Sequence, residues 1–219
     1  MNRYYWAALG VSKTFHGDAA SLRRLEESFG SVREFYVASE DALRASRVLA
    51  PTLLEKFLQR RNLGLPAFLE TQCRTKGIDV ISIEDRRYPH LLKEIHDPPV
   101  ALYLKGQLPA TDQCVAIVGP RSADEYGLRS ASLFARDLAE VGLTIVSGGA
   151  RGIDTAAHEA ALEAGGVTIA ILGCGVDVPY PYANRRLYER ISRSGALLSE
   201  YPPGTPPYQY HFPRRNRLI

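Results

Sequence analysis

The sequence has few cysteines and no long apolar run. The three cysteines, Cys73, Cys114 and Cys174, are odd in number and lack the CxxC spacing that is typical of zinc sites. A disulfide framework and a zinc site are therefore poorly supported, and we expect a cytoplasmic location. No stretch approaches the roughly 18 apolar residues that span a membrane. The first residues, MNRYYWAALG, are too short and too aromatic for a signal peptide.

The sequence also lacks the motifs of common nucleotide-binding and hydrolytic sites. It has no GxxxxGK[ST] motif, and no lysine after Lys105 that would complete one, which argues against ATP hydrolysis by a P-loop. A GxGxxG turn, which binds dinucleotide cofactors, is missing, and Ser147 does not stand in a GxSxG elbow. These absences argue against a dinucleotide cofactor and a P-loop nucleotide site, and we predict no cofactor and no metal ion.

Positive charge is concentrated near the C-terminus. The 219 residues include 27 Lys and Arg against 24 Asp and Glu, a formal net charge of +3. The last 19 residues contain Arg214, Arg215 and Arg217 and no acidic residue, so they carry the whole excess. Every basic residue after Lys105 is an arginine, whose planar guanidinium suits phosphate better than a lysine does.

The first 76 residues are predicted to be helical. Residues 21–30 have apolar side chains at helical spacing and end on Gly30, a suitable C-cap. Pro51 suits the first turn of a helix over residues 51–62. Short helices between glycine turns indicate a small bundle similar to helix-hairpin-helix modules. Such a bundle either contacts a nucleic-acid backbone or serves as a docking or spacer unit, and its balanced charge favours the second role.

The pattern changes after residue 76. Two short strands are predicted at residues 77–85 and 100–106, and four apolar strands alternating with amphipathic helices follow from Cys114. This alternation indicates a parallel sheet with right-handed crossovers. We therefore predict an α/β fold with a Rossmann-like sheet over residues 77–219, preceded by a helical domain over residues 1–76.

The turn SGGARGID, residues 147–154, is the strongest candidate for a binding site. In an open parallel sheet, ligands bind beyond the carboxyl ends of the strands, where this turn is expected. Gly148, Gly149 and Gly152 permit unusual backbone angles, and the next helix points its N–H groups toward the loop. Arg151 adds a phosphate donor. A tight turn with a surface arginine explains the same residues equally well.

Two further segments are expected at the same edge. Arg121 follows the first apolar strand, and two arginines beside a glycine turn favour an anion site more than either alone. The tail YPPGTPPYQYHFPRRNR interleaves arginines with aromatic residues, a combination that holds single-stranded nucleic acid. A proline-rich connection to a further strand is compatible with the same residues. The aromatic residues of the tail are Tyr201, Tyr208, Tyr210 and Phe212.

Other polar residues near this edge have structural explanations. His158 and Cys174 are predicted to be packed in the core rather than catalytic. Asp154 is predicted to cap its helix or to orient the arginine of the loop. Asp177, Asp154 and Glu200 are expected near one another, without the features of a metal site.

The resemblance to a known family covers nearly the whole chain, although the N-terminal matches are weaker. Five stretches carry it most clearly. They are VAIVGPRSADEYG, SGGARGIDTAAHEAAL, TIAILGCGVDVPYPYANRRLY, GALLSEYPPGTPP and HFPRRNR. In this order, they resemble the bacterial DNA-processing protein A family, also called DprA or Smf. The resemblance implies a SAM-like helical domain, an extended Rossmann domain and binding of single-stranded DNA. It also implies protection of incoming strands and loading of the RecA recombinase in natural transformation, homodimers of the full-length protein and no enzymatic reaction.

The resemblance also implies a DNA-binding pocket. Its arginines would pair with phosphates, its phenylalanine would stack on a base, and the amides of the glycine loop would cradle one phosphate. The implied residues are Arg121, Ser147, Gly148, Gly149, Ala150, Arg151, Gly152, Phe212, Arg214, Asn216 and Arg217.

The sequence departs from the family pattern in two places. Pro120 stands where the family has Ser or Thr, which removes a hydroxyl and an amide donor. The chain stops at Ile219, where the family continues with further strands and with surfaces for self-association and RecA. We therefore expect a fragment or a truncated gene, an exposed sheet edge beside Leu218 and less than full family activity.

Two other functions remain open. A nucleotide phosphoribohydrolase similar to the lysine-decarboxylase-like family would use a comparable glycine loop. That family has a PGGxGTxxE context, whereas this loop reads SGGARGID and has no glutamate at the expected spacing. The other alternative is an inactive truncated product. A single-stranded DNA-binding mediator is the function that we predict.

Overall fold

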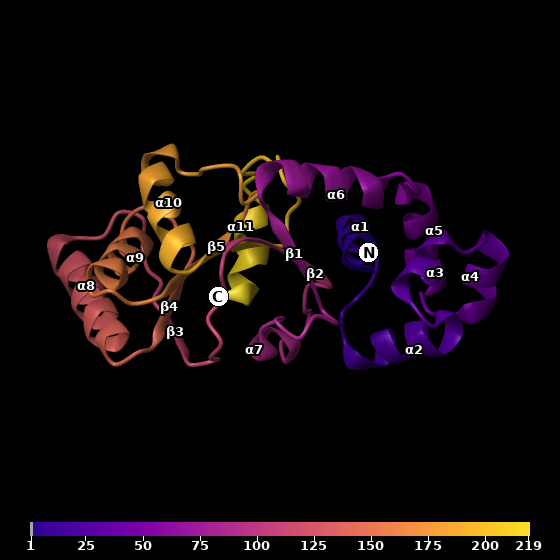
Figure 1. Ribbon diagram of the computed structural model, residues 1–219, viewed down its shortest axis with the longest axis horizontal. Helices are drawn as coiled ribbons and strands as arrows, with labels where there is room; N and C mark the ends of the chain where they lie inside the picture. Colours follow the sequence, from indigo (N-terminus) through magenta and orange to yellow (C-terminus); the bar gives the residue numbers. More distant parts are fainter. Residues whose placement is uncertain (1) are drawn as a thin grey trace. The chain divides into compact units, whose positions relative to one another are not determined.

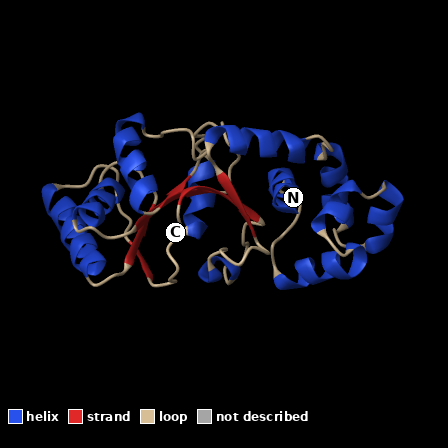
Figure 2. Ribbon diagram, in the orientation of Figure 1, coloured by secondary structure: helices blue, strands red, loops and turns tan. Residues whose placement is uncertain are grey.

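The computed structural model describes residues 2–219, which form two compact units that divide between Leu102 and Tyr103. The first unit is mostly helical, whereas the second combines helices with strands (Figures 1 and 2). The helical part of the first unit ends at Lys76. The predicted boundary at residue 76 stays a prediction, because the strand that follows packs against the helices of the first unit.

Six helices occupy residues 2–76. Gly30 ends the second of them in the left-handed conformation, with φ of 71°, and Pro51 opens the fifth, as predicted. Asp18, Ser31 and Ser39 cap three of the helices by accepting a hydrogen bond from a backbone N–H in the first turn. The helices are α1 (Asn2–Ser12), α2 (Ala19–Phe29), α3 (Val32–Val37), α4 (Glu40–Ser46), α5 (Pro51–Arg60) and α6 (Leu65–Lys76).

Aromatic side chains form the core of the first unit. The ring of Phe35 stacks on that of Phe57, with centroids 5.3 Å apart, and meets Phe15 and Phe29 edge to face. Trp6 of α1 is fully buried, and short helices such as these depend on this packing for stability. The unit continues through β1 (Asp79–Ser82), α7 (His90–Lys93) and the start of β2 (Ala101–Gly106).

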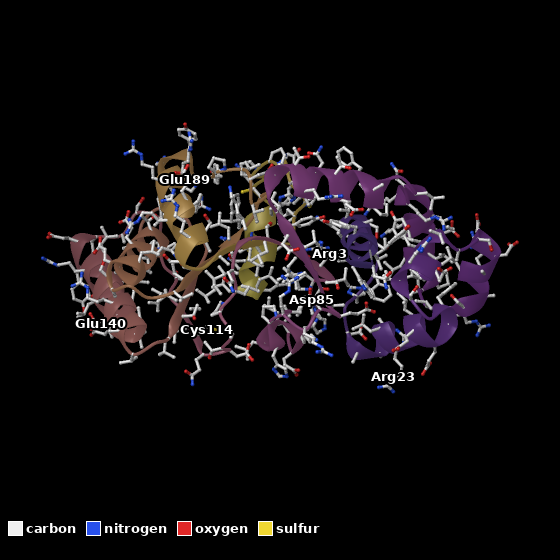
Figure 3. All side chains as sticks on the ribbon, viewed as in Figure 1. Arg3, Arg23, Asp85, Cys114, Glu140 and Glu189 are labelled. Carbon is white, nitrogen blue, oxygen red and sulfur yellow. The ribbon has the colours of Figure 1, made fainter. Side chains whose placement is uncertain are left out.

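A network of ion pairs lies on the surface of the first unit. Arg3 contacts Asp79 at 2.8 Å, and Arg87 contacts both Asp79, at 2.6 Å, and Asp85, at 2.8 Å. Figure 3 labels Arg3 and Asp85 at the two ends of this network. The network joins α1 to the segment around β1.

The second unit contains the predicted parallel sheet. Its strands are hydrogen-bonded in the order β2-β6-β5-β4-β3, in which β3 to β6 are parallel and β2 is antiparallel to β6. The Rossmann-like α/β fold is therefore confirmed. The strands of the second unit are the end of β2, β3 (Cys114–Ala116), β4 (Thr144–Ser147), β5 (Thr168–Leu172) and β6 (Ala196–Ser199).

Helices cover both faces of this sheet. Figure 1 shows α8, α9 and α10 on one face and α11 on the other. Alanines such as Ala135 and Ala157, with Ile145 of β4, make the tightly packed core between the sheet and the first two of these helices. The helices are α8 (Glu125–Glu140), α9 (Ile153–Glu163), α10 (Arg185–Ser194) and α11 (His211–Arg215), with 3₁₀ turns η1 (Tyr182–Asn184) and η2 (Asn216–Leu218).

The edge strand β3 differs from its expected form. The apolar run predicts a strand over residues 114–119, but β3 ends at Ala116, and both Cys114 and Ala116 are exposed. Leu218 is only 4% exposed, whereas β3 forms an exposed edge of the sheet; the expectation of an exposed edge beside Leu218 stays a prediction. Among residues 2–219, no helix is both long and apolar enough to cross a membrane.

Candidate nucleic-acid interface

The loop between β4 and α9 turns on two glycines with positive φ. Gly149 has φ of 69°, and Gly152 has φ of 77° with ψ of −126°. A Cβ atom on Gly152 would lie 2.4 Å from the carbonyl oxygen of Pro120. The amide of Ile153 also faces this carbonyl at 3.4 Å. The glycine loop and the turn after β3, predicted to share one edge, are therefore in contact.

Asp154 binds the amides of the glycine loop. Its carboxylate is nearly buried, and Oδ2 accepts the N–H groups of Gly148 at 3.1 Å and Ala150 at 3.2 Å. Asp154 thus stabilises the loop that precedes its own helix. Since a carboxylate already occupies these two N–H groups, they can cradle a phosphate only if Asp154 moves away.

Side chains of the neighbouring helices bind the loop carbonyls. The carbonyl of Gly149 accepts hydrogen bonds from Asn184 Nδ2 at 3.0 Å and from Tyr188 Oη at 2.7 Å. Asn184 also donates to Thr155 Oγ1 at 2.8 Å, which donates in turn to the carbonyl of Ala150 at 2.7 Å. Burial raises the pKa of Tyr188, so its hydroxyl remains a donor at neutral pH. These bonds fix the path of the loop.

Arg215 connects the basic C-terminal segment to the same loop. It is 5% exposed, and its Nη1 atom donates to the carbonyls of Gly148, at 2.7 Å, and Ile171. A Cβ atom on Gly148 would lie 2.7 Å from both Arg215 Nη2 and Asp154 Oδ2, so glycine leaves room for the two charged groups. Burial lowers the pKa of Arg215, and the Asp154 carboxylate opposes this effect.

Phe212 brings three segments together. The guanidinium carbon of Arg121 lies 5.5 Å from the centroid of the Phe212 ring, and that of Arg215 lies 6.0 Å from it. The ring of Tyr180 is 5.5 Å away. At the end of β5, a Cβ atom on Gly173 would lie 2.8 Å from Phe212 Cδ1. The turns after β3 and β5 therefore meet the C-terminal segment at one partly exposed ring.

Arg121, which lies beside this ring, and Arg151, which belongs to the glycine loop, are exposed cations. Across residues 2–219, neither forms an ion pair with a carboxylate, whereas other arginines of the second unit do. An anion can therefore bind either guanidinium without displacing an acidic partner. A groove of about 500 Å³ between α8 and α9 begins at Arg121 and Gly152.

Arg214 and Arg217 share one acidic partner. Arg217 contacts both oxygens of Glu200, at 2.9 and 3.1 Å, and Arg214 Nε lies 3.8 Å from Glu200 Oε2. Glu200 is largely buried, with a side chain that is 13% exposed. Asn216 is exposed, and its Oδ1 atom accepts a hydrogen bond from Arg215. The positive charge of the two arginines is therefore partly compensated.

Several residues of the predicted interface are buried, among them Gly148 and Gly149 of the loop. Ser147 is fully buried, and its hydroxyl donates to a backbone carbonyl at 2.6 Å. Tyr201 is 3% exposed and stacks on His211, with ring centroids 3.8 Å apart. Tyr208 and Tyr210 are exposed and stack on each other. Of the aromatic residues in the tail, Tyr201 therefore stabilises the fold, whereas the others reach the surface.

His158 and Cys174 are core residues, as predicted. His158 is fully buried, with Nδ1 2.7 Å from Thr168 Oγ1, and burial lowers the pKa of its imidazole to about 3. Burial raises the pKa of the Cys174 thiol to about 11. The oxygen Oδ1 of Asp177 accepts the amide of Gly204 at 2.8 Å. No group of three or more His, Cys, Asp or Glu residues suited to a metal ion occurs within the described part of the chain.

The sequence analysis did not predict the roles of four residues of this site, although it named Arg215 as part of the basic tail. Asn184 and Tyr188 carry a usable signal, because residues four apart lie on one face of a helix. Tyr180 stands in the loop before that helix. Arg215 carries no signal, because no local pattern distinguishes it from Arg214.

The parallel strand order, the glycine turn at the carboxyl end of β4 and the unpaired arginines define a Rossmann-like protein with a candidate anion-binding edge. A sequence profile of the family described as DNA recombination-mediator protein A matches residues 79–219. The chain therefore belongs to this family, as the resemblance implies.

Named relatives agree with this assignment. Protein Smf of a Synechocystis strain is 39% identical over 221 residues, which cover 98% of this chain and 55% of the relative. DNA processing protein DprA of Streptococcus pneumoniae is 50% identical over 139 residues, which cover 63% of this chain and 49% of the relative. The chain thus spans about half the length of these curated relatives.

Two solved structures are also similar. The X-ray structure of DprA from Streptococcus pneumoniae matches the whole chain and 74% of its own, with a TM-score of 0.77 and 36% identity. DprA from Helicobacter pylori matches 64% of each chain, with a TM-score of 0.57 and 35% identity. The description of the second structure refers to the single-stranded DNA binding mode of that protein.

Proposed function

We propose that this chain binds single-stranded DNA at the edge formed by Arg121, the loop 147–152 and Phe212. The observation that carries the proposal is the placement of the exposed, unpaired Arg121 against the partly exposed ring of Phe212, with a second exposed, unpaired arginine, Arg151, in the glycine loop that contacts the turn of Arg121. Cations that contact phosphates and aromatic rings that stack on bases are the two components of single-strand binding. The DNA-binding Helicobacter pylori relative supports the proposal.

The proposed residues have different roles. Arg121 and Arg151 pair with phosphates, and the Arg121 guanidinium moves off the Phe212 ring so that a base can stack there. The buried loop residues, with Ser147 at their start, shape the edge rather than contact DNA through their side chains. Arg214, Asn216 and Arg217 contribute at the rim, where Glu200 weakens the positive potential.

The test removes the two unpaired arginines together. We expect Arg121→Ala combined with Arg151→Ala to weaken binding of a labelled oligothymidylate at least tenfold in fluorescence anisotropy. The slope of log K against log salt should fall by about 1.4, because each lost phosphate contact removes about 0.7 for a single strand.

The matched control is Arg129→Ala combined with Arg136→Ala. These arginines lie on α8 in the same unit and pair with glutamates, so the control makes the same change in net charge. It should leave the affinity within about twofold, as expected for exposed ion pairs. Full retention of binding by the Arg121 and Arg151 variant would refute the site, whatever the control does.

We propose that the biological role of the protein is the one that the family description gives, the mediation of DNA recombination. It includes protection of incoming single strands, delivery of these strands to RecA during natural transformation, and self-association of the full-length protein. A cytoplasmic location is part of the same proposal and is supported by Cys73, Cys114 and Cys174, which form no disulfide within the described residues. Co-sedimentation of RecA with DNA bound to this chain tests the partner.

The hydrolase alternative has less support in the geometry. A phosphoribohydrolase needs an available carboxylate at the glycine loop, and the Asp154 carboxylate is 5% exposed and already binds two amides. Release of free adenine from AMP, followed by chromatography, would show that activity directly.

A further inference from the structure

A row of arginines follows the outer face of α10. Arg186, Arg190 and Arg193 are separated by four and three residues, a spacing that places them on one face of a helix. All three are exposed, whereas Leu187 and Ile191 on the opposite face are buried. With a rise of about 1.5 Å per residue, the three residues, named here the α10 arginine row, cover about 10 Å of the helix axis.

The α10 arginine row differs from nearby arginines because it lacks acidic partners. Arg129 and Arg136 on α8 lie 3.1 and 3.7 Å from glutamates. Arg185, at the start of α10, lies 3.2 Å from Glu189, which Figure 3 labels on this helix. Throughout residues 2–219, no carboxylate lies within ion-pair distance of any member of the row. The row is therefore a stripe of uncompensated positive charge.

The helix that carries the row packs against the proposed DNA-binding edge. Tyr188, on the buried face opposite the row, binds the carbonyl of Gly149, so α10 is fixed to the glycine loop. The ring of Tyr180 lies 5.5 Å from that of Phe212, and Tyr182, which is 70% exposed, follows two residues later. Tyr180 and Tyr182 therefore connect the surroundings of Phe212 to the first turn of α10, where the row starts.

We propose that the α10 arginine row extends the DNA-binding edge and holds phosphates of the same single strand. The inference rests on the proposed function and adds a second, separate contact region to it. A single strand needs cations spaced along its backbone with aromatic rings between them, and this surface offers both. Each cation is an arginine, which can hold a phosphate with two hydrogen bonds.

The test compares two lengths of DNA. The variant Arg186→Gln with Arg190→Gln and Arg193→Gln keeps good helix formers on an exposed face, so α10 should remain folded. We expect it to bind an oligothymidylate of roughly 25 nucleotides about tenfold more weakly, and to bind one of roughly 6 nucleotides almost unchanged. The salt slope for the long strand should fall by about 2, since three phosphate contacts are lost.

The charge-matched control is Arg23→Gln with Arg33→Gln and Arg74→Gln. These arginines of the first unit are exposed and lack ion pairs within the described residues, and Figure 3 shows Arg23 directed away from α2. An equal loss in this control would mean that total charge, and not the row, matters. That result overturns the inference.

The outcomes separate this inference from the proposed function. If the row variant binds the long strand as the wild type does, while the Arg121 and Arg151 variant loses both lengths, the extension fails and the proposed function stands. If the wild type binds neither strand, both fail. If the row binds polyglutamate and contributes nothing to DNA affinity, its partner is an acidic protein and the inference is wrong.

Discussion

Arg215 belongs to the basic C-terminal segment, but its surroundings differ from those of its neighbours. Arg214 and Arg217 contact Glu200 near the surface, whereas Arg215 is buried against the carbonyls of Gly148 and Ile171. A guanidinium that points inward cannot reach phosphate. Its role is to position the glycine loop relative to α11, and therefore to place Phe212 beside Arg121.

Replacing Arg215 should mainly affect stability. Arg215→Ala leaves two carbonyls and the nearly buried Asp154 without a cation, so we expect a loss of about 3–5 kcal/mol in the free energy of unfolding. Arg214→Ala, the adjacent control, should cost about 1 kcal/mol or less, because its ion pair is partly exposed. Urea unfolding followed by circular dichroism measures both. Similar losses in the two variants would contradict a positioning role for Arg215.

Among the elements, the glycine loop depends on contacts from four segments. Its amides bind Asp154 of α9, and its carbonyls bind side chains from α9, η1, α10 and α11. Such a loop is set before any ligand arrives, so it shapes the edge at little entropic cost during binding. Gly152 makes this possible, because its backbone angles and its approach to Pro120 both exclude a side chain.

A pair of glycine substitutions separates backbone strain from the role of the loop. Gly152→Ala forces a Cβ atom to within 2.4 Å of the Pro120 carbonyl, whereas Gly165→Ala, also at positive φ, meets no atom within 4 Å. The positive φ costs each variant about 1–3 kcal/mol, and Gly152, with ψ of −126°, lies outside the left-handed helical region. We expect Gly152→Ala to lose about 2 kcal/mol more through the clash, and to bind DNA more weakly. Equal stability and equal affinity of the two variants would contradict this account.

The order of strands and helices could be predicted because their periodicities are local. Residues 168–172, for example, form an apolar run that ends at a glycine, and β5 occupies that run. The exposure of β3 could not be predicted, because an apolar run has the same sequence pattern in an edge strand as in a central strand of a sheet. Likewise, the contact of Arg217 with Glu200 joins residues whose pairing depends on tertiary structure.

In the whole molecule, the formal charge is a poor guide to the cationic surface. The net excess of +3 falls in the last 19 residues, yet Arg215 there is buried and the other two arginines share Glu200. Among the described residues of the second unit, the exposed arginines without acidic partners are instead Arg121, Arg151 and the α10 arginine row. The candidate site is thus partly predictable: the loops and Phe212 follow from the sequence, but the distribution of compensated charge does not.

The most direct test of the central claim is photochemical cross-linking of this chain to a bromodeoxyuridine-substituted single strand, with the attachment site located by mass spectrometry. We expect the cross-linked peptide to contain Phe212, and we expect the yield to fall sharply in Phe212→Leu. Cross-links confined to residues 2–102, or an unchanged yield at the same peptide in Phe212→Leu, would contradict binding at the edge formed by Arg121, the glycine loop and Phe212.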